Sequence, residues 1–109
     1  MAGSRAGNII AGAWAAMLSI GHDGYRKNAK IILDACAGMK KAIREEVPEL
    51  QVATYHDSSI VALIQKPGYD INPIALNDVI KKYHNMYLGA TQNPSGLHIS
   101  MTMPLALEW

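Results

Sequence analysis

One long apolar stripe at helical spacing, in residues 23–47, sets the architecture that the rest of this chain must accommodate. Apolar side chains recur there in alternating steps of four and three residues, with charged side chains on the opposite face. This period is typical of an amphipathic helix that covers a partner layer. Asp23 is a suitable cap at its start, and Pro48 follows its end. The stripe consists of Tyr25, Ala29, Ile32, Cys36, Met39 and Ile43.

A shorter apolar helix is predicted before this stripe, from about Gly7 to Ile20. Gly21 supplies the residue that commonly ends a helix. The loop Gly3–Gly7, which reads Gly-Ser-Arg-Ala-Gly, opens this helix. It presents a hydroxyl, a guanidinium and free backbone amides, which suits a phosphate, although the same spacing also occurs as an ordinary helix entry. The apolar residues at helical spacing are Ile10, Trp14, Met17 and Leu18.

Two strands are predicted next, at Leu50–Tyr55 and Ser59–Gln65. The residues between them, His56-Asp57-Ser58, favour turns, so the two strands are expected to form a hairpin. Asn72-Pro73 then combines a helix cap with proline at the first helical position. This predicts a further helix that ends near His84-Asn85.

The last part of the chain is predicted to complete a sheet. A short strand is expected at Met86–Leu88, followed by a turn at residues 92–96. Apolar and polar side chains then alternate from Leu97 to Thr102, which predicts a final strand that ends at Pro104. The order of elements indicates an α+β fold, with a small antiparallel sheet of three to four strands covered on one face by helices.

Composition limits the classes of partner. The chain has 109 residues, half of them hydrophobic, which suits one small core. Its net charge of +1 gives no electrostatic case for nucleic acid or an anionic membrane surface. Lys40, Lys41 and Arg44 are expected on one solvated helix face. The apolar stretch Ile9–Ile20 is too short to span a bilayer, so no transmembrane helix is predicted.

The remaining candidate sites are isolated residues. Cys36 lies within the apolar stripe, which favours a buried, unreactive thiol. His98 is predicted beside Ser100 and Thr102 on the polar face of a strand, where it either lines a pocket or has a structural role. The four histidines and the one cysteine do not have the spacing of zinc ligands, so no metal site is predicted. Tyr83, His84 and Tyr87 either approach a substrate or pack against the helical layer.

Three motifs of the chain resemble one enzyme family. They are the Gly3–Gly7 loop, the joint Ile20-Gly21-His22-Asp23-Gly24-Tyr25, and Gln92-Asn93-Pro94 together with Leu97–Thr102. In this order and at about this spacing they resemble the sphingosine-1-phosphate lyases. These belong to the group of pyridoxal-phosphate-dependent decarboxylases with the aspartate-aminotransferase (type I) fold. The likeness covers nearly the whole chain.

The resemblance implies a domain organisation and a function. Residues 1–22 would be a loop and interface helix of the large-domain and dimer region, and residues 23–109 the small carboxy-terminal α+β domain. The full enzyme would cleave the C2–C3 bond of a phosphorylated sphingoid base, which gives a fatty aldehyde and phosphoethanolamine. It would be a homodimer in the cytoplasm or at the cytosolic face of the endoplasmic reticulum. This chain alone is expected to form a homodimer or a domain-swapped oligomer.

The resemblance also assigns a cofactor site. Family members use a serine or threonine in the helix-opening loop to reach the phosphate of pyridoxal 5'-phosphate held by the neighbouring subunit, and Ser4 occupies that position. Gly3 and Arg5 would lie at the same phosphate. A charge-assisted contact from Arg5 is one possibility, and bracing of the loop at the dimer interface is the other.

The chain departs from the family at the catalytic lysine. In the family the Schiff-base lysine directly follows a histidine, whereas His22, His56, His84 and His98 are followed here by Asp, Asp, Asn and Ile. The aspartate that partners the pyridine nitrogen and the stacking histidine belong to the upstream large domain. No catalytic residue is therefore expected in this chain. It should be an inactive piece of a longer enzyme and should not bind the cofactor alone.

Two other interpretations remain open. An amino-acid decarboxylase, such as a glutamate or tyrosine decarboxylase, shares the serine-arginine pair, although the Pro94–Thr102 stretch favours the lyase. The chain could also be a free-standing, non-catalytic α+β module for binding or dimerisation. Self-association separates the fragment from the module, because a fragment exposes surface that a large dimer normally buries.

Overall fold

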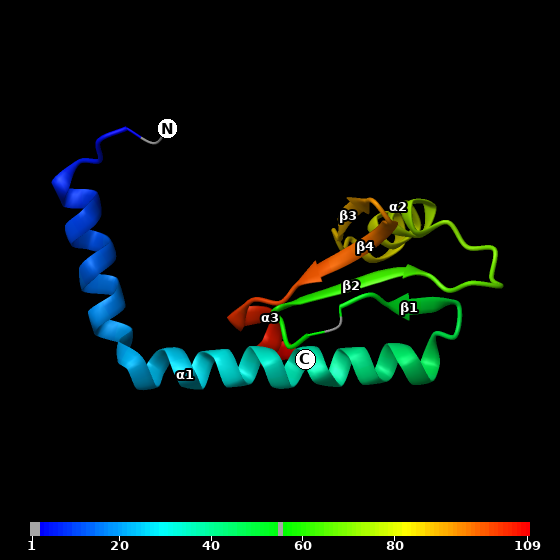
Figure 1. Ribbon diagram of the computed structural model, residues 1–109, viewed down its shortest axis with the longest axis horizontal. Coiled ribbons are helices and arrows are strands. Elements are labelled where there is room, and N and C mark those ends of the chain that lie inside the picture. Colours follow the sequence, from blue (N-terminus) through cyan, green and yellow to red (C-terminus); the bar gives the residue numbers. More distant parts are fainter. Residues whose placement is uncertain (1–2, 55) are drawn as a thin grey trace. The chain divides into compact units, whose positions relative to one another are not determined.

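The computed structural model describes residues 3–54 and 56–109 (Figure 1). The described residues form a four-stranded antiparallel sheet and three helices, which confirms the predicted α+β fold. They divide into two compact units, one up to Lys30 and the other Ile31–Trp109. The elements in chain order are α1 (Gly7–Glu46), β1 (Leu50–Val52), β2 (Ile60–Gln65), α2 (Pro73–His84), β3 (Gly89–Gln92), β4 (Ser95–Ser100) and α3 (Met103–Glu108).

Helix α1 is interrupted at Gly21. This residue has φ 66° and ψ 173°, which is outside the helical region and inaccessible to most L-residues. The interruption confirms that the first predicted helix ends here and that a second one follows. The second stretch ends at Glu46, one residue before Val47, whose N–H still donates to the carbonyl of Ile43 at 3.0 Å.

The hydrophobic core lies in the second unit, between the last part of α1 and the sheet. Figure 1 shows this part of α1 running alongside β1 and β2. Leu76 of α2 and Ala106 of α3 pack against the same core, so the three helices cover one face of the sheet, as predicted. The buried residues are Ala35, Cys36, Met39, Leu50, Val52, Val61, Leu63, Leu97 and Met101.

The strand order is β1-β2-β4-β3, with antiparallel neighbours throughout. Leu63 of β2 pairs with Val52 on one side and with Leu97 on the other, so apolar side chains line up across three strands on the covered face. This register confirms the alternation predicted for the last strand and the hairpin predicted for the first two.

Strand β1 is shorter than predicted, because the side chain of Thr54 replaces the backbone as hydrogen-bond partner. Tyr55, the last residue of the predicted strand, lies outside the described residues. The Ala53 N–H donates to the carbonyl of Ala62 at 2.8 Å, but the Ala62 N–H donates to the Thr54 side-chain Oγ1 at 2.8 Å. A side-chain acceptor of this kind ends regular strand pairing while leaving no donor unsatisfied.

Helix α2 begins and ends as predicted. The Asn72 side chain accepts hydrogen bonds from the N–H groups of Ile74 and Ala75, at 2.9 and 3.3 Å, and Pro73 occupies the first turn. Asn85 follows the helix in the left-handed conformation, with φ 51°, and its N–H donates to the Lys81 carbonyl.

Two predicted elements at the end of the chain are corrected. The strand expected at Met86–Leu88 is wrong, since β3 begins only at Gly89. The Leu88 carbonyl instead accepts a hydrogen bond from the Asn77 side chain of α2, at 3.1 Å. The chain also does not end in a strand, because α3 follows β4. Pro104 lies in the first turn of α3, where a missing N–H removes no helical hydrogen bond.

The turn predicted at residues 92–96 is confirmed in a shorter form. Asn93 and Pro94, joined by a cis peptide bond, connect β3 to β4, and the Thr91 hydroxyl donates to the Pro94 carbonyl at 2.8 Å. Gly96 then allows a close approach of strands. A β-carbon at this position would overlap the Leu63 carbonyl and lie 2.9 Å from Thr91 Oγ1.

Candidate functional site

Among the described residues, the start of α1 offers backbone donors that have no helical acceptor. The Ala6 carbonyl accepts from the N–H groups of Ile9 and Ile10, at 3.1 and 3.4 Å, so the helical hydrogen bonds begin with these residues. The N–H groups of Gly7 and Asn8 lie at the helix start, where no helical carbonyl can reach them. The first turn contains no acidic residue that would neutralise the positive end of the helix.

Ser4 and Arg5 lie in this loop with exposed side chains. Within the described residues neither makes a side-chain hydrogen bond or an ion pair, and Gly3 is exposed beside them. The loop is therefore not sealed inside a core. A hydroxyl, a guanidinium and free amides close together in sequence match the donor groups that a phosphate takes, and the assignment of Gly3, Ser4 and Arg5 to a cofactor phosphate stays a prediction.

The helix that follows this loop exposes an apolar face. Its large apolar side chains are at least 42% exposed, and Trp14 is 61% exposed. Apolar side chains exposed together on one helix are often covered by a partner. The residues of this face, which we call the interface-helix face, are Ile9, Ile10, Trp14, Met17, Leu18 and Ile20.

Cys36 is buried in the core, as predicted. Burial raises the pKa of its thiol above the ordinary value of 9.0, and the positive charge of Lys40 partly opposes this effect. A thiol that stays protonated near neutral pH is a poor nucleophile.

The structure corrects the prediction that Lys40 lies on a solvated helix face. Lys40 was expected there with Lys41 and Arg44, but only 8% of its surface is exposed, whereas Lys41 and Arg44 are exposed. Its Nζ donates to the carbonyl of His56, in the loop that joins β1 to β2, at 3.1 Å. The sequence held a signal for this burial, because Lys40 lies one turn after Cys36 and so borders the apolar stripe.

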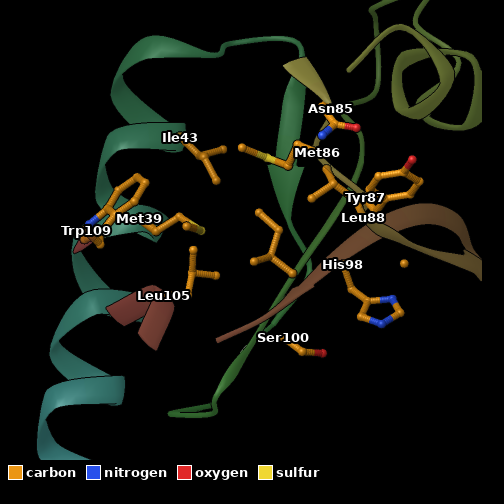
Figure 2. A pocket seen from close by; sticks show the side chains of 12 residues that line it. Met39, Ile43, Asn85, Met86, Tyr87, Leu88, His98, Ser100, Leu105 and Trp109 are labelled. Carbon is orange, nitrogen blue, oxygen red and sulfur yellow. The ribbon is translucent and has the colours of Figure 1, made fainter. Parts of the chain in front are cut away.

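An apolar cavity of about 660 Å³ lies between α1, α3 and the segment that leads into β3 (Figure 2). Met39 and Ile43 of α1 face Met86 and Leu88 across it. Trp109, at the end of the chain, also lines it, and the sequence analysis did not single it out because α3 was not foreseen. No lysine lines this cavity within the described residues.

His98 borders this cavity, but its ring is directed to the other side of β4, next to Gly89. The two residues are paired across β3 and β4, and any β-carbon at Gly89 would overlap the imidazole ring. The ring nitrogen Nδ1 is buried and lacks a partner among the described residues. The packing against Gly89 supports the structural role for His98. The ring is not fully hydrogen-bonded, because its buried Nδ1 has no partner among the described residues.

The other aromatic candidates lie at the surface. Tyr83 is 68% exposed and Tyr87 is 70% exposed. Lys82 Nζ lies 5.2 Å from the Tyr83 ring centre, and Lys81 Nζ lies 5.1 Å from that of Tyr87. These are cation–π contacts on an open surface. Only Tyr87 reaches the apolar cavity, whereas His84 does not line it.

Neither metal nor membrane features stand out in residues 3–54 and 56–109. No group of three histidine, cysteine or acidic side chains is placed to hold a metal ion there. Over the same residues, no helix combines the length and the apolar character that crossing a bilayer requires.

The chain is similar to curated sphingosine-1-phosphate lyases. It is 39% identical to the protein of that name from Arabidopsis thaliana over 103 residues, 38% to that of Oryza sativa over 104, and 32% to that of Saccharomyces cerevisiae over 102. Each match covers 94% of this chain but only 17–18% of the relative, so the chain spans less than a fifth of their length. No protein-family model matches the chain.

A solved structure gives the same result. The sphingosine-1-phosphate lyase of Burkholderia pseudomallei superposes with a TM-score of 0.78 at 29% identity, over 99% of this chain and 24% of that one. Sequence and fold therefore agree on the resemblance. The chain is, over nearly its whole length, a counterpart of one segment of the sphingosine-1-phosphate lyases.

Proposed function

We propose that this chain is the carboxy-terminal region of a pyridoxal-phosphate-dependent lyase similar to the sphingosine-1-phosphate lyases. The observation that supports this most strongly is the identity of up to 39% over 94% of the chain. Residues 1–22 serve as the loop and interface helix of the large-domain and dimer region, and residues 23–109 as the small carboxy-terminal domain. The exposed interface-helix face fits a segment that a larger assembly covers.

Ser4, with Gly3 and Arg5, contacts the phosphate of pyridoxal 5'-phosphate bound by the neighbouring subunit. The residues fit this group, because the Ser4 hydroxyl and the guanidinium are exposed beside backbone amides that lack helical partners. The bound cofactor supplies an electron sink for cleavage of the C2–C3 bond. The contribution of this chain is to hold the phosphate in place.

The whole enzyme acts on a phosphorylated sphingoid base as a homodimer, and releases a fatty aldehyde and phosphoethanolamine. This chain alone is inactive. It has no His-Lys pair, and six of its lysines are exposed side chains while Lys40 donates to a backbone carbonyl.

A chimeric enzyme tests this function. The matching segment of the Burkholderia pseudomallei lyase is replaced by this chain, and cleavage of a phosphorylated sphingoid base is measured. We expect activity to be retained, and Ser4→Ala to weaken cofactor affinity by about tenfold or more, as for loss of a hydrogen bond to a charged group. Ser19→Ala is the matched control, since the Ser19 hydroxyl only donates to the Ala16 carbonyl of its own helix.

The chimera also separates the alternatives. A folded, dimeric chimera that does not cleave the phosphorylated sphingoid base would count against the lyase and favour the decarboxylase, which shares the serine-arginine pair. Equal cofactor affinity in the Ser4→Ala and Ser19→Ala variants would contradict the role of Ser4.

The isolated chain provides two further measurements. Mixed with pyridoxal phosphate, it should give no yellow adduct and no product after borohydride reduction, and a stable adduct on one lysine would contradict the proposal. Light scattering should show self-association through the interface-helix face. A monomer at all concentrations would instead favour an autonomous module.

A further inference from the structure

A second, polar cavity lies in the second unit and shares no residue with the Gly3–Arg5 loop or with the apolar cavity. It has a volume of about 200 Å³ and lies between α1 and the loop that joins β1 to β2. Lys40 and Arg44 line it from the helix, and Thr54 and Ser58 line it from the loop. Two cationic side chains and two hydroxyls therefore surround one small space.

The buried cation is the unusual feature of this cavity. Lys40 is the one buried charged side chain among the described residues. Its ammonium has three donors, of which one is used by the His56 carbonyl at 3.1 Å. Within the described part of the chain no carboxylate lies within 4.0 Å of Nζ. A buried ammonium without a counter-ion is costly, so a neighbouring anion would stabilise it.

Arg44 adds a second positive charge one turn further along the helix. It forms no side-chain hydrogen bond or ion pair with other described residues, so its five donors are available. The Asp57 carboxylate also lines the cavity, which leaves one more formal positive than negative charge around it. The remaining positive charge favours an anionic occupant over a cation.

Each of the two hydroxyls retains a hydrogen that it can donate. Thr54 Oγ1 accepts the Ala62 N–H at 2.8 Å, and Ser58 Oγ accepts the Ile60 N–H at 3.1 Å. Because each oxygen already accepts from the backbone, its own hydrogen remains free to donate. The cavity is therefore rich in donors of several kinds.

We propose that this cavity binds a phosphate group, held by Lys40 and Arg44 and by the hydroxyls of Thr54 and Ser58. A phosphate presents several acceptor oxygens and matches a point ammonium combined with a planar guanidinium. A cavity of about 200 Å³ accommodates a phosphate and a small substituent. The site is independent of the function proposed above, because it shares no residue with the Gly3–Arg5 loop.

An NMR titration of the full chain tests this site. Inorganic phosphate and glycerol 3-phosphate are added separately, with sodium chloride at equal ionic strength as the reference. We expect saturable shifts of the amide signals of Thr54, Ser58 and Lys40 with at least one phosphate probe. Saturation with inorganic phosphate identifies a site for the free ion, and saturation with glycerol 3-phosphate alone identifies a site for a phosphomonoester.

Variants locate the contact. Lys40→Met keeps the aliphatic stem and removes the charge, and Arg44→Gln changes an exposed residue that the fold does not need. Each should weaken phosphate binding by about tenfold or more. Lys41→Met is the matched control, since Lys41 is the next residue and its Nζ lies at the surface 4.0 Å from Glu45; its effect should stay within about twofold.

Three results would overturn the site. They are the absence of saturation with both phosphate probes, an equal response to sodium chloride, and an unchanged affinity in the Arg44→Gln variant. The last result is decisive even if Lys40→Met fails to fold, because Arg44 is exposed and its replacement leaves the core intact.

Discussion

The helix before Gly21 and the second unit use the same kinds of residue with opposite outcomes. Trp14 is 61% exposed, whereas Val61 is completely buried. Both belong to regular apolar patterns, one at helical spacing and one at strand spacing. The stripe that contains Cys36 and Met39 faces a sheet and forms a core, while the interface-helix face remains open. Periodicity thus shows that a face needs a partner but does not show that the partner is present.

Core truncation gives the largest expected contrast between the two regions. Leu97 is 1% exposed, and Leu97→Ala should lower the free energy of unfolding by about 2–5 kcal/mol through lost burial and an unfilled cavity. Leu18→Ala, at a residue 61% exposed, should change it by less than about 0.5 kcal/mol. Urea denaturation measures both. Equal losses would show that the interface-helix face contributes to the same core.

Glycine substitutions sharpen the contrast, because they should have opposite signs. Gly96→Ala places a methyl group on the Leu63 carbonyl and should cost about 1–3 kcal/mol. Gly12→Ala meets no atom within 4 Å in the first helical stretch and should favour the helix by about 0.5–1 kcal/mol. Denaturation and far-ultraviolet circular dichroism follow the two effects. A stabilising Gly96→Ala would mean that β2 and β4 are not held this closely.

The cap of α2 should have a smaller effect. Asn72→Ala removes the acceptor for the Ile74 and Ala75 N–H groups and should cost about 1 kcal/mol. Asn72→Ser retains an acceptor and should cost much less, as measured by thermal unfolding of both variants. Neither α1 nor α2 has an acidic residue in its first turn, so the start of α2 depends on the Asn72 side chain. Equal stability of the two variants would show that the cap contributes nothing.

The smallest expected effect at neutral pH concerns Cys36. Burial raises the pKa of its folded-state thiol above 9.0, so the unfolded state loses the proton first as pH rises. The resulting stabilisation is fully present below pH 9.0 and should decline as pH increases through the folded pKa. The pH dependence of unfolding, compared with that of Cys36→Ala, isolates this contribution. An identical alkaline profile for the two proteins would contradict a raised pKa.

Local sequence signals predicted most of the fold. Gly21, the Asn72-Pro73 pair and the alternation from Leu97 each act through their own backbone or neighbours, and each has the expected structure. The predictions are wrong where the local structure depends on a contact with a residue distant in sequence. The Leu88 carbonyl bonds to Asn77 of α2 rather than to a strand, and that contact depends on the fold.

The candidate sites were less predictable for the same reason. Ser4 and Arg5 follow from a local motif, and their exposure agrees with it. The charge of Lys40 predicts a surface position. In the structure its Nζ instead donates a hydrogen bond to the His56 carbonyl, 16 residues away in sequence. The polar cavity beside Lys40 is lined by residues of both α1 and the loop between β1 and β2, so no single stretch of sequence predicts it.

The glycine at position 21 has a wider effect than ending one helix. At 1.5 Å per residue, an unbroken α1 of 40 residues would be a rod about 60 Å long. Counted at 3.6 residues per turn, Trp14 and Cys36 would lie within about 40° of each other around the axis of that rod. A straight α1 would carry one continuous apolar stripe, and the sheet could cover only the last part of it. Because Gly21 adopts a non-helical conformation, α1 consists of two helical stretches, and their apolar stripes need not follow one helix axis.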